Sequence, residues 1–450
     1  MSEEFISQPG QVVIDKIYLY SVANNRIVNL EDYLVELMIY ESIFAPFVTG
    51  EILLSDSRNL IRELDICGEE LLYVSFRTPS LDQGKSISKL FKIYALKDRA
   101  FAKDGAVNIY RLEFASIEAF QNLVNPIYKA FSGEPFNIVE NIFKTYLQSE
   151  NFPIGETDIK RDTKSPLVLF GTPTNVLKFV SPGWTPLQNI MFVASRTNSK
   201  NNGAASYLFW ETTKGFYFVN IGDLKLNYNN LTIGEYTFSM SQIKNLSEQD
   251  KAEGKFMFGI RDLTFEKIFD NIENAKKGYL ANRLIDVDLL GKSYEYTDYD
   301  HMDKFYNYPH MNNEAVVPIF NPYTVRNPKI HSRINYIHKN LHTGYIDNFD
   351  VKQKEIFGNR RSNILELENL DIKITIPGRT DIEVGRTIKV NVPKDDPGAT
   401  DRDFNFDPNF SGHYLITSLS HKLNLRTHMI TMNITKESMP YTKWGEGGGY

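Results

Sequence analysis

The sequence is poor in cysteine, in long apolar runs and in excess charge of either sign, and each shortage excludes a class of protein. Its 450 residues include one cysteine, Cys67, so no disulfide can form within the chain. The least charged stretch, residues 165–195, is interrupted by Lys178 and by prolines, whereas a membrane-spanning helix needs about 20 predominantly apolar residues. The formal net charge of −6 disfavours a chain that binds nucleic acid through phosphate contacts.

Apolar residues, by contrast, are abundant. Hydrophobic residues make up 42% of the chain and aromatic residues 13%, so it can bury enough apolar surface to fold. At roughly 150 residues per domain, the length predicts about three domains. The first residues, MSEEFISQPG, lack the basic segment and apolar stretch of a signal peptide. We therefore expect a protein made in a reducing cytosol and not exported by that route.

Residues 1–125 have the pattern of an antiparallel β domain. Apolar and polar side chains alternate across residues 33–40, as on a strand with one buried face. Further segments rich in aromatic and β-branched residues follow at 50–56, 70–78, 89–96 and 108–116. A short helix is predicted near residues 57–64, where Asp56 or Ser57 can cap the first turn.

Residues 126–225 mix helical and strand patterns. Apolar residues recur at helical spacing after Pro135, and a second helix is predicted to start at Pro186, because proline is favoured in a first turn. Residues 206–213 and 215–221 are predicted to pair as a hairpin. We expect an α/β domain inserted between β-rich parts.

The second half of the chain alternates between weak and strong patterns. Residues 263–344 are rich in Tyr, Asn and Pro with weak periodicity, which predicts a loop-rich insertion. Strand patterns return at 369–378, 386–392, 413–423 and 428–436. We assign residues 226–262 and 345–436 to a second, discontinuous β domain, and residues 437–450, with the end GEGGGY, to a flexible tail.

Two β segments follow the same order of strands and turns. After Gly68 come EELLYVSFRTP, a polar loop, FKIYAL, a hairpin and YRLEFASIE; after Gly385 come RTIKVNVPKD, a longer polar loop, YLITSL, a hairpin and MITMNITKES. Identities are few, and any two antiparallel segments share alternation, so chance similarity stays open. The agreement of four successive elements favours duplication. Duplicated domains with open edge strands would need those edges covered or paired.

Three segments carry a family resemblance: ESIFAPFVTGEILLSDSRNLIRELDICGEELLYVSFRTP (41–79), DIKITIPGRTDIEVGRTIKVNVP (371–393) and SGHYLITSLSHKLN (411–424). They resemble the central baseplate hub protein of contractile-tailed bacteriophages, and the hub halves of type VI secretion spike proteins are similar. The resemblance implies a β-rich α+β fold. It would have two similar antiparallel tube-like domains (barrels or sandwiches), an inserted α/β domain and a loop-rich insertion.

The same resemblance implies a structural function. Three chains would form a homotrimer whose six tube-like domains make a pseudo-sixfold ring. One face would continue the hexameric tail tube or a tube-initiator protein, the other would hold a trimeric spike protein, and baseplate wedge proteins would surround the ring. DNA would pass through the channel without specific binding. The protein would be part of the virion tail baseplate, assembled in the bacterial host cytoplasm, with no membrane insertion, no cofactor and no enzymatic activity.

The loop at residues 401–407 is a candidate site for a metal or a partner. Oxygen ligands stand at alternate positions, as in a calcium loop: Asp401, Asp403, Asn405 and Asp407. However, Phe406 stands where a calcium loop needs glycine, and Gly412 stands where it needs a bidentate Glu. An exposed acidic loop is therefore favoured over a metal site, and its three aspartates are candidate contacts with a neighbouring ring.

Three further residues are interface candidates. Arg360 and Arg361 form a short basic run that can hold carboxylates of a partner, although an ordinary charged turn is the alternative. Trp444, in the glycine-rich tail, is a candidate docking residue.

Two other functions stay open. A glycan-binding or cell-wall-degrading baseplate enzyme is suggested by carboxylates that lie among tyrosines: Glu295, Asp298, Asp300 and Asp303 with Tyr294, Tyr296, Tyr299 and Tyr306. A glycosidase needs two carboxyls at a defined separation, and a solvated loop has the same composition. A nucleic-acid-binding module is disfavoured because the chain is net acidic and lacks a basic helix.

Overall fold

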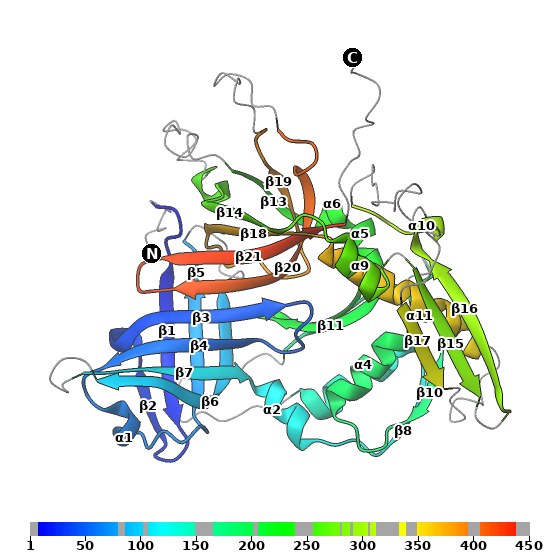
Figure 1. Cartoon of the computed structure of the whole chain (residues 1–450). Coiled ribbons are helices and arrows are strands. Elements are labelled where there is room, and N and C mark those ends of the chain that lie inside the picture. Colours follow the sequence, from blue (N-terminus) through cyan, green and yellow to red (C-terminus); the bar gives the residue numbers. More distant parts are fainter. Residues whose placement is uncertain are drawn as a thin grey trace.

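One large sheet dominates the protein, and helices and smaller sheets pack beside it in the computed structural model (Figure 1). The structure describes residues 8–79, 86–101, 107–148, 165–200, 206–238, 255–279, 281–288, 291–304, 307–311, 333–338, 349–394 and 406–437. Strands outnumber helices there, so the predicted β-rich α+β fold is confirmed. In this part of the chain, no helix is long and apolar enough to cross a membrane.

The amino-terminal strands form one side of the large sheet. They are β1 (Val13–Ser21), β2 (Arg26–Asn29), β3 (Leu34–Ser42), β4 (Thr49–Asp56), β5 (Leu71–Arg77), β6 (Ile87–Phe101) and β7 (Asn108–Ser116). Alternate residues such as Ile52, Leu54 and Leu112 are buried in one apolar core, as the alternation predicted. The short helices η1 (Glu31–Tyr33) and α1 (Leu60–Glu63) flank β3 and β4. The N-cap residue of α1 is Asn59 and not Asp56 or Ser57, but Asp56 accepts a hydrogen bond of 2.7 Å from the N–H of Leu60, the first residue of the helix.

The carboxy-terminal strands form the other side. They are β13 (Thr232–Thr237), β14 (Asp262–Lys267), β18 (Leu370–Pro377), β19 (Thr387–Asn391), β20 (Gly412–Leu423) and β21 (His428–Lys436). The isoleucines of β18 and β21 are buried in a second apolar core. All four strands predicted between residues 369 and 436 are confirmed.

The two groups of strands pair in the same order. The amino-terminal order is β3-β4-β7-β6-β5-β1, and the carboxy-terminal order is β14-β18-β21-β20-β19-β13. Neighbours are antiparallel in both groups, with one exception. β13 lies parallel to β19, whereas β1 lies antiparallel to β5.

The β-bulges also fall at the same place. The pairing of β6 with β7 is interrupted between Ile93 and Ala95, and that of β20 with β21 between Ile416 and Ser418. One extra residue therefore bends the strand at the same point in each group.

These registers correct one detail of the sequence comparison. The cross-strand pairs make Leu72 equivalent to Ile388. Gly385 then falls one position after the equivalent of Gly68. Both glycines have positive φ, 94° at Gly68 and 81° at Gly385, so each allows a turn just before a strand although they are not equivalent residues.

β20 and β3 join the two groups. β20 pairs with β19 over residues 412–415 and, beyond its bulge, with β3 over residues 418–423. The two β domains expected from the sequence thus share one continuous sheet in the described residues, because the end of β20 leaves its own group.

The α/β part packs against this junction. It contains α2 (Ile117–Val124), β8 (Ala130–Gly133), α3 (Pro135–Ile142), the π-helical turn η4 (Phe143–Leu147), β9 (Leu167–Phe170), β10 (Leu177–Val180), α4 (Pro186–Arg196), β11 (Tyr207–Thr212), β12 (Gly215–Asn220), α5 (Ile221–Leu226) and α6 (Tyr228–Leu231). Thr185 and Gln188 cap α4 reciprocally, so it starts at Pro186 as predicted. The predicted hairpin is β11–β12.

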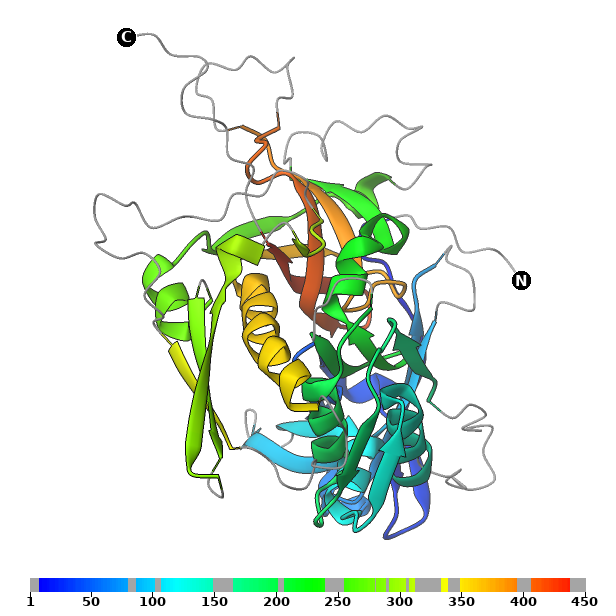
Figure 2. The same cartoon turned by 90° about the vertical axis from the view of Figure 1, so that its right-hand side faces the viewer.

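The interpretation of residues 263–344 as irregular loops is wrong for the described part. Most of β14 lies in this range and joins the large sheet, and β16-β15-β17 form a separate sheet. The elements of this region and of the following segment are η5 (Lys255–Phe258), α9 (Asn271–Lys277), β15 (Ala281–Asp288), β16 (Ser293–Asp300), α10 (His301–Lys304), β17 (Arg333–His338), α11 (Phe349–Leu365) and η8 (Glu366–Glu368). β16 is largely exposed, so it lacks the alternation by which strands were predicted. Figure 2 shows α11 between this sheet and the rest of the molecule.

Candidate functional site at the junction of the two strand groups

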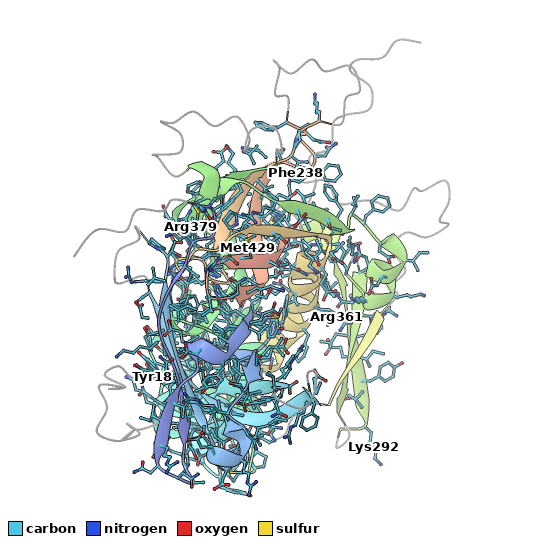
Figure 3. All side chains as sticks on the ribbon, turned by 90° about the vertical axis from the view of Figure 1, so that its left-hand side faces the viewer. Tyr18, Phe238, Lys292, Arg361, Arg379 and Met429 are labelled. Carbon is cyan, nitrogen blue, oxygen red and sulfur yellow. The ribbon has the colours of Figure 1, made fainter. Side chains whose placement is uncertain are left out.

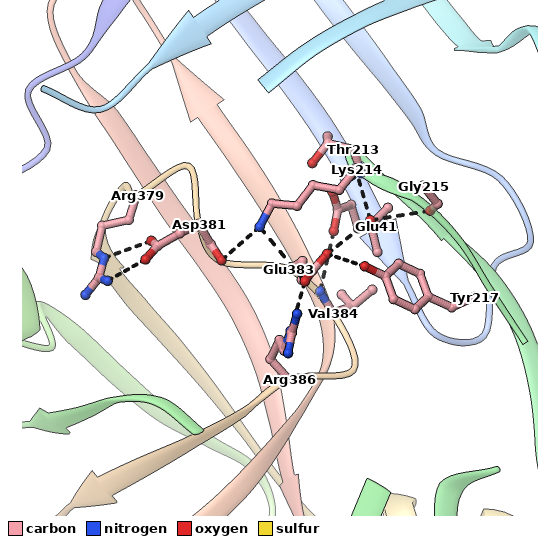
Figure 4. Close-up of polar contacts among 11 residues, drawn as sticks. Glu41, Thr213, Lys214, Gly215, Tyr217, Arg379, Asp381, Glu383, Val384 and Arg386 are labelled. Atoms are coloured by element: carbon pink, nitrogen blue, oxygen red, sulfur yellow. Dashed lines mark hydrogen bonds and ion pairs between the residues drawn. The ribbon is translucent and has the colours of Figure 1, made fainter. Parts of the chain in front are cut away.

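The tip of the β11–β12 hairpin lies between the two strand groups (Figure 4). It contacts β3 and β6 on the amino-terminal side, and the loop between β18 and β19 on the carboxy-terminal side. Every residue of β11 is buried. The hairpin is thus an internal link between the groups, and it can hold them at a fixed angle.

Glu41, on β3, is bonded to both of the other parts. Its carboxylate accepts hydrogen bonds from the N–H of Thr213 at 2.7 Å and from the N–H of Val384 at 3.5 Å. Burial raises the pKa of Glu41 to about 7, and the nearby carboxylate of Glu383 adds to the rise. One buried side chain therefore connects β3, the hairpin and the β18–β19 loop.

Glu383 makes the second set of contacts. It accepts hydrogen bonds from the Tyr217 hydroxyl and from Nε of Arg386, each at 2.9 Å. Nζ of Lys214 lies 3.9 Å from the same carboxylate. Burial and the Glu383 charge raise the pKa of Tyr217, so its hydroxyl stays a donor. The hairpin is thereby held to the carboxy-terminal group.

The neighbouring loop is held by a further charge cluster. Arg379 donates two hydrogen bonds to Asp381, at 3.0 and 2.7 Å, and Nζ of Lys214 donates to the Asp381 carbonyl oxygen at 3.1 Å. These contacts fix the β18–β19 loop against the hairpin turn (Figure 4).

Glu211 makes the third set of contacts, with residues of the amino-terminal group. Its carboxylate accepts from Nζ of Lys89 on β6 at 2.5 Å and from the N–H of Val48 at 2.8 Å. Burial raises the pKa of Glu211 to about 7, although the charge of Lys89 opposes the rise. The hairpin is thus bonded to both groups through buried charges.

The contacts suit a mechanical junction better than a reactive centre. Each of the three buried carboxylates accepts a hydrogen bond from another element, and burial explains the raised pKa values of Glu41 and Glu211 without a catalytic role. In the part of the chain that the structure describes, no group of three His, Cys, Asp or Glu residues is placed to hold a metal ion.

Of the predicted acidic loop, the structure describes Asp407. Asp401, Asp403 and Asn405 lie outside the described residues, as does Trp444. Asp407 Oδ1 accepts a hydrogen bond of 2.8 Å from the N–H of Asn409, and its own N–H donates to Val392. This carboxylate therefore shapes the turn that leads into β20.

Arg360 and Arg361 lie within helix α11, so the charged-turn interpretation is wrong. Arg360 donates to the carbonyl oxygens of Ala194 and Tyr207, at 3.2 and 2.9 Å, and burial lowers its pKa to about 10. Arg361 Nε donates to the carbonyl oxygen of Lys277; it is labelled in Figure 3. Both arginines hold α11 to its neighbours, and their role at an interface stays a prediction.

The acidic and aromatic segment proposed for glycans is an exposed strand. Alternation along β16 places Glu295 on the face opposite Asp298 and Asp300. Asp298 is held by Nε and Nη2 of Arg283, at 2.6 and 2.8 Å. The arginine also lies over the Tyr296 ring, 4.5 Å from its centre. This pairing is typical of a solvated sheet face.

Comparisons with known proteins address the fold as a whole. No protein-family model and no curated protein matches the sequence. Among solved structures, a tail protein of Neisseria meningitidis MC58 is similar, with a TM-score of 0.52 and 10% identity over 94% of this chain and 97% of that one. The 43 kDa tail protein of prophage MuSo2 from Shewanella oneidensis is similar with a TM-score of 0.50 and 9% identity, over 94% of this chain and 98% of that one. The chain has the fold of a prophage tail protein. The structural resemblance expected from the sequence is confirmed at this level.

Sequence reasoning missed the junction of this tail-protein fold. Glu41, Glu211 and Glu383 come from segments far apart in the sequence, and none of them belongs to a motif. A signal existed at Glu211, which stands in the otherwise uncharged run YLFW-E-TT of a predicted strand. An isolated charge in such a strand requires a partner, but the identity of Lys89 depends on the tertiary fold.

Proposed function

We propose that this protein is the structural, non-enzymatic hub of a contractile phage tail baseplate. Three copies form a pseudo-sixfold ring that adapts a hexameric tail tube or tube initiator to a trimeric spike. The observation that carries the proposal is the repeated strand order, with its repeated bulge, in the two halves of one chain. Three chains then supply six nearly equivalent units, and a threefold assembly can meet a sixfold one.

Each strand group closes into a tube-like domain in this proposal. Residues 1–125 form the first, and residues 226–262 with 345–436 form the second. Residues 126–225 supply the β11–β12 hairpin, whose buried Glu41, Glu211 and Glu383 contacts set the angle between the two domains. A fixed angle matters because a ring closes only if the rotation from unit to unit is constant.

Partner contacts are assigned to the two faces of the ring and to its rim. The spike binds one face, the tube the other, and baseplate wedge proteins surround the ring. The acidic loop with Asp401, Asp403 and Asp407 contacts a neighbouring ring, and Arg361 and Trp444 contact a partner protein. DNA passes through the channel without specific binding, since the net charge of −6 disfavours adhesion of phosphates. The protein belongs to the virion tail.

Mass and shape in solution test this function. Light scattering of the purified protein should give three times the chain mass of 51.8 kDa, and cryo-electron microscopy class averages should show a three-lobed ring with a central hole. Addition of the cognate spike should give a complex with one spike trimer per ring. A monodisperse monomer that stays monomeric with the spike would contradict the proposal.

A further inference from the structure

The junction of β20 and β3 gives a template for a second junction. Beyond its bulge, β20 pairs with β3 through Ser418 to Leu423. Lys422 faces Met38 in this register, and its Nζ forms an ion pair of 2.7 Å with Glu36. The carboxy-terminal group of strands is thus joined to the amino-terminal group through the pairing of β20 with β3.

The equivalent half of β6 has an edge available. β6 pairs with β5 up to Lys92. Beyond its first bulge, residues 95–97 and 100–101 pair, among the described residues, with β7 alone, and a second bulge lies between Lys97 and Ala100. Residues 97–101 are exposed, and Phe101 keeps 66% of its surface accessible. A large aromatic side chain at an open strand edge is a typical site for pairing with another strand.

The strand equivalent to β3 also has an edge available. That strand is β14, which pairs, among the described residues, with β18 alone. Asp262, Thr264 and Glu266 are exposed on it, between half-buried Leu263 and Phe265. In the sheet order, β18, β21, β20, β3, β4 and β7 separate β14 from β6, and Figure 1 shows the two at opposite ends. Their edges can meet only between two chains.

We propose that residues 97–101 of β6 pair antiparallel with β14 of a second copy of this chain, in the register of β20 with β3. This inference rests on the proposed ring and names the contact that closes it. The contact is head-to-tail, since one chain contributes β6 and the other β14. Such contacts generate a ring when the rotation closes.

The register can be transferred through the residues that face equivalent partners, because each edge carries one extra residue: β6 has a bulge between Lys97 and Ala100, and β14 has one between Phe265 and Lys267. Lys422 and Ala100 face equivalent residues of their hairpin partners, Met429 and Ile109. Met38 and Thr264 likewise face equivalent residues of β4 and β18, so Thr264 is equivalent to Met38. Because Lys422 faces Met38 within the chain, Ala100 faces Thr264 of the second copy.

Disulfide trapping tests the register. Cys67 is the one cysteine of the chain and is exposed, so Cys67→Ser gives a cysteine-free background. In that background, Ala100→Cys with Thr264→Cys should form disulfides between chains under mild oxidation, because facing β residues have Cα atoms about 4.5–5.5 Å apart. Non-reducing gels should show covalent dimers and trimers, with no larger species. The control is Ala100→Cys with Tyr294→Cys, which places the second thiol on exposed β16 and should give no cross-link.

Light scattering of the same samples under reducing conditions separates the two proposals. A trimer without the Ala100–Thr264 cross-link would overturn the strand pairing and leave the hub function standing. A monomer without cross-links would overturn both. A covalent trimer that appears with the Thr264 pair and not with the Tyr294 pair supports both.

Discussion

At the scale of single residues, Glu41 determines how the junction responds to pH. Its folded pKa of about 7 lies above the ordinary value of 4.5. The stability that its protonation contributes is therefore fully present below pH 4.5 and is lost as the pH rises through 7. Glu41→Gln is neutral throughout. Its unfolding free energy, relative to the wild type, should rise by roughly 1.4 kcal/mol per pH unit across this interval.

Urea denaturation at several pH values in this interval measures the difference. Glu140→Gln is the matched control, because the Glu140 side chain is 42% exposed and pairs with Lys144 on a helix surface. The control difference should stay flat with pH. A flat difference for Glu41→Gln as well would show that Glu41 is ionised at no cost in the folded protein.

The Lys89–Glu211 pair should be strongly coupled. The two side chains are 9% and 0% exposed, so Lys89→Met leaves a buried carboxylate without its cation. We expect a loss of about 3–5 kcal/mol in unfolding free energy, with much of it recovered in Lys89→Met combined with Glu211→Gln. Denaturant titration of the single and double variants measures this coupling. Lys144→Met, which breaks the exposed pair with Glu140, should cost less than about 0.5 kcal/mol in unfolding free energy. Equal losses for Lys89→Met and Lys144→Met would contradict a stabilising role of the buried Lys89–Glu211 pair.

At the scale of elements, strands with one buried face could be predicted from the sequence, and exposed ones could not. β4, β7, β20 and β21 alternate clearly because one side faces an apolar core. β16 does not, and its region was interpreted as loops. The order of elements in the repeat can be predicted from the sequence. Its register cannot, because only the cross-strand pairs show that Gly385 lies one position after the equivalent of Gly68.

The same glycines give a prediction for the β18–β19 loop. A Cβ atom at Gly385 would lie 2.8 Å from Cζ2 of Trp210, whereas at Gly68 the nearest atom is 3.6 Å away. Both have positive φ, so alanine should cost about 1 kcal/mol at either position from backbone strain. Gly385→Ala should cost a further 1–3 kcal/mol or so from the clash with Trp210. Thermal unfolding of the two variants compares them, and equal losses would contradict tight packing of the loop on the hairpin.

At the scale of the whole molecule, the chain contains one strand junction, in which β20 pairs with β3. It also carries the two strands of the proposed second junction, β6 and β14, which pair between neighbouring chains. Phe101→Asp should therefore weaken the trimer without unfolding the chain, because Phe101 is 66% exposed. Light scattering at decreasing concentration should show earlier dissociation than for Tyr294→Asp, whose site on β16 is also exposed. Equal dissociation of the two variants would place the interface elsewhere.

The direction of the external junction can be tested by mixing single-cysteine chains. In the Cys67→Ser background, chains with Ala100→Cys alone should not cross-link to one another, because β6 never meets β6 in a head-to-tail ring. Chains with Thr264→Cys alone should behave in the same way. When the two are co-expressed with tags of different mass, disulfide-linked pairs should contain one chain of each kind, because each Ala100 position faces a Thr264 position of its neighbour. Cross-links between like chains would instead show a twofold contact, which pairs two chains and cannot propagate around a threefold ring.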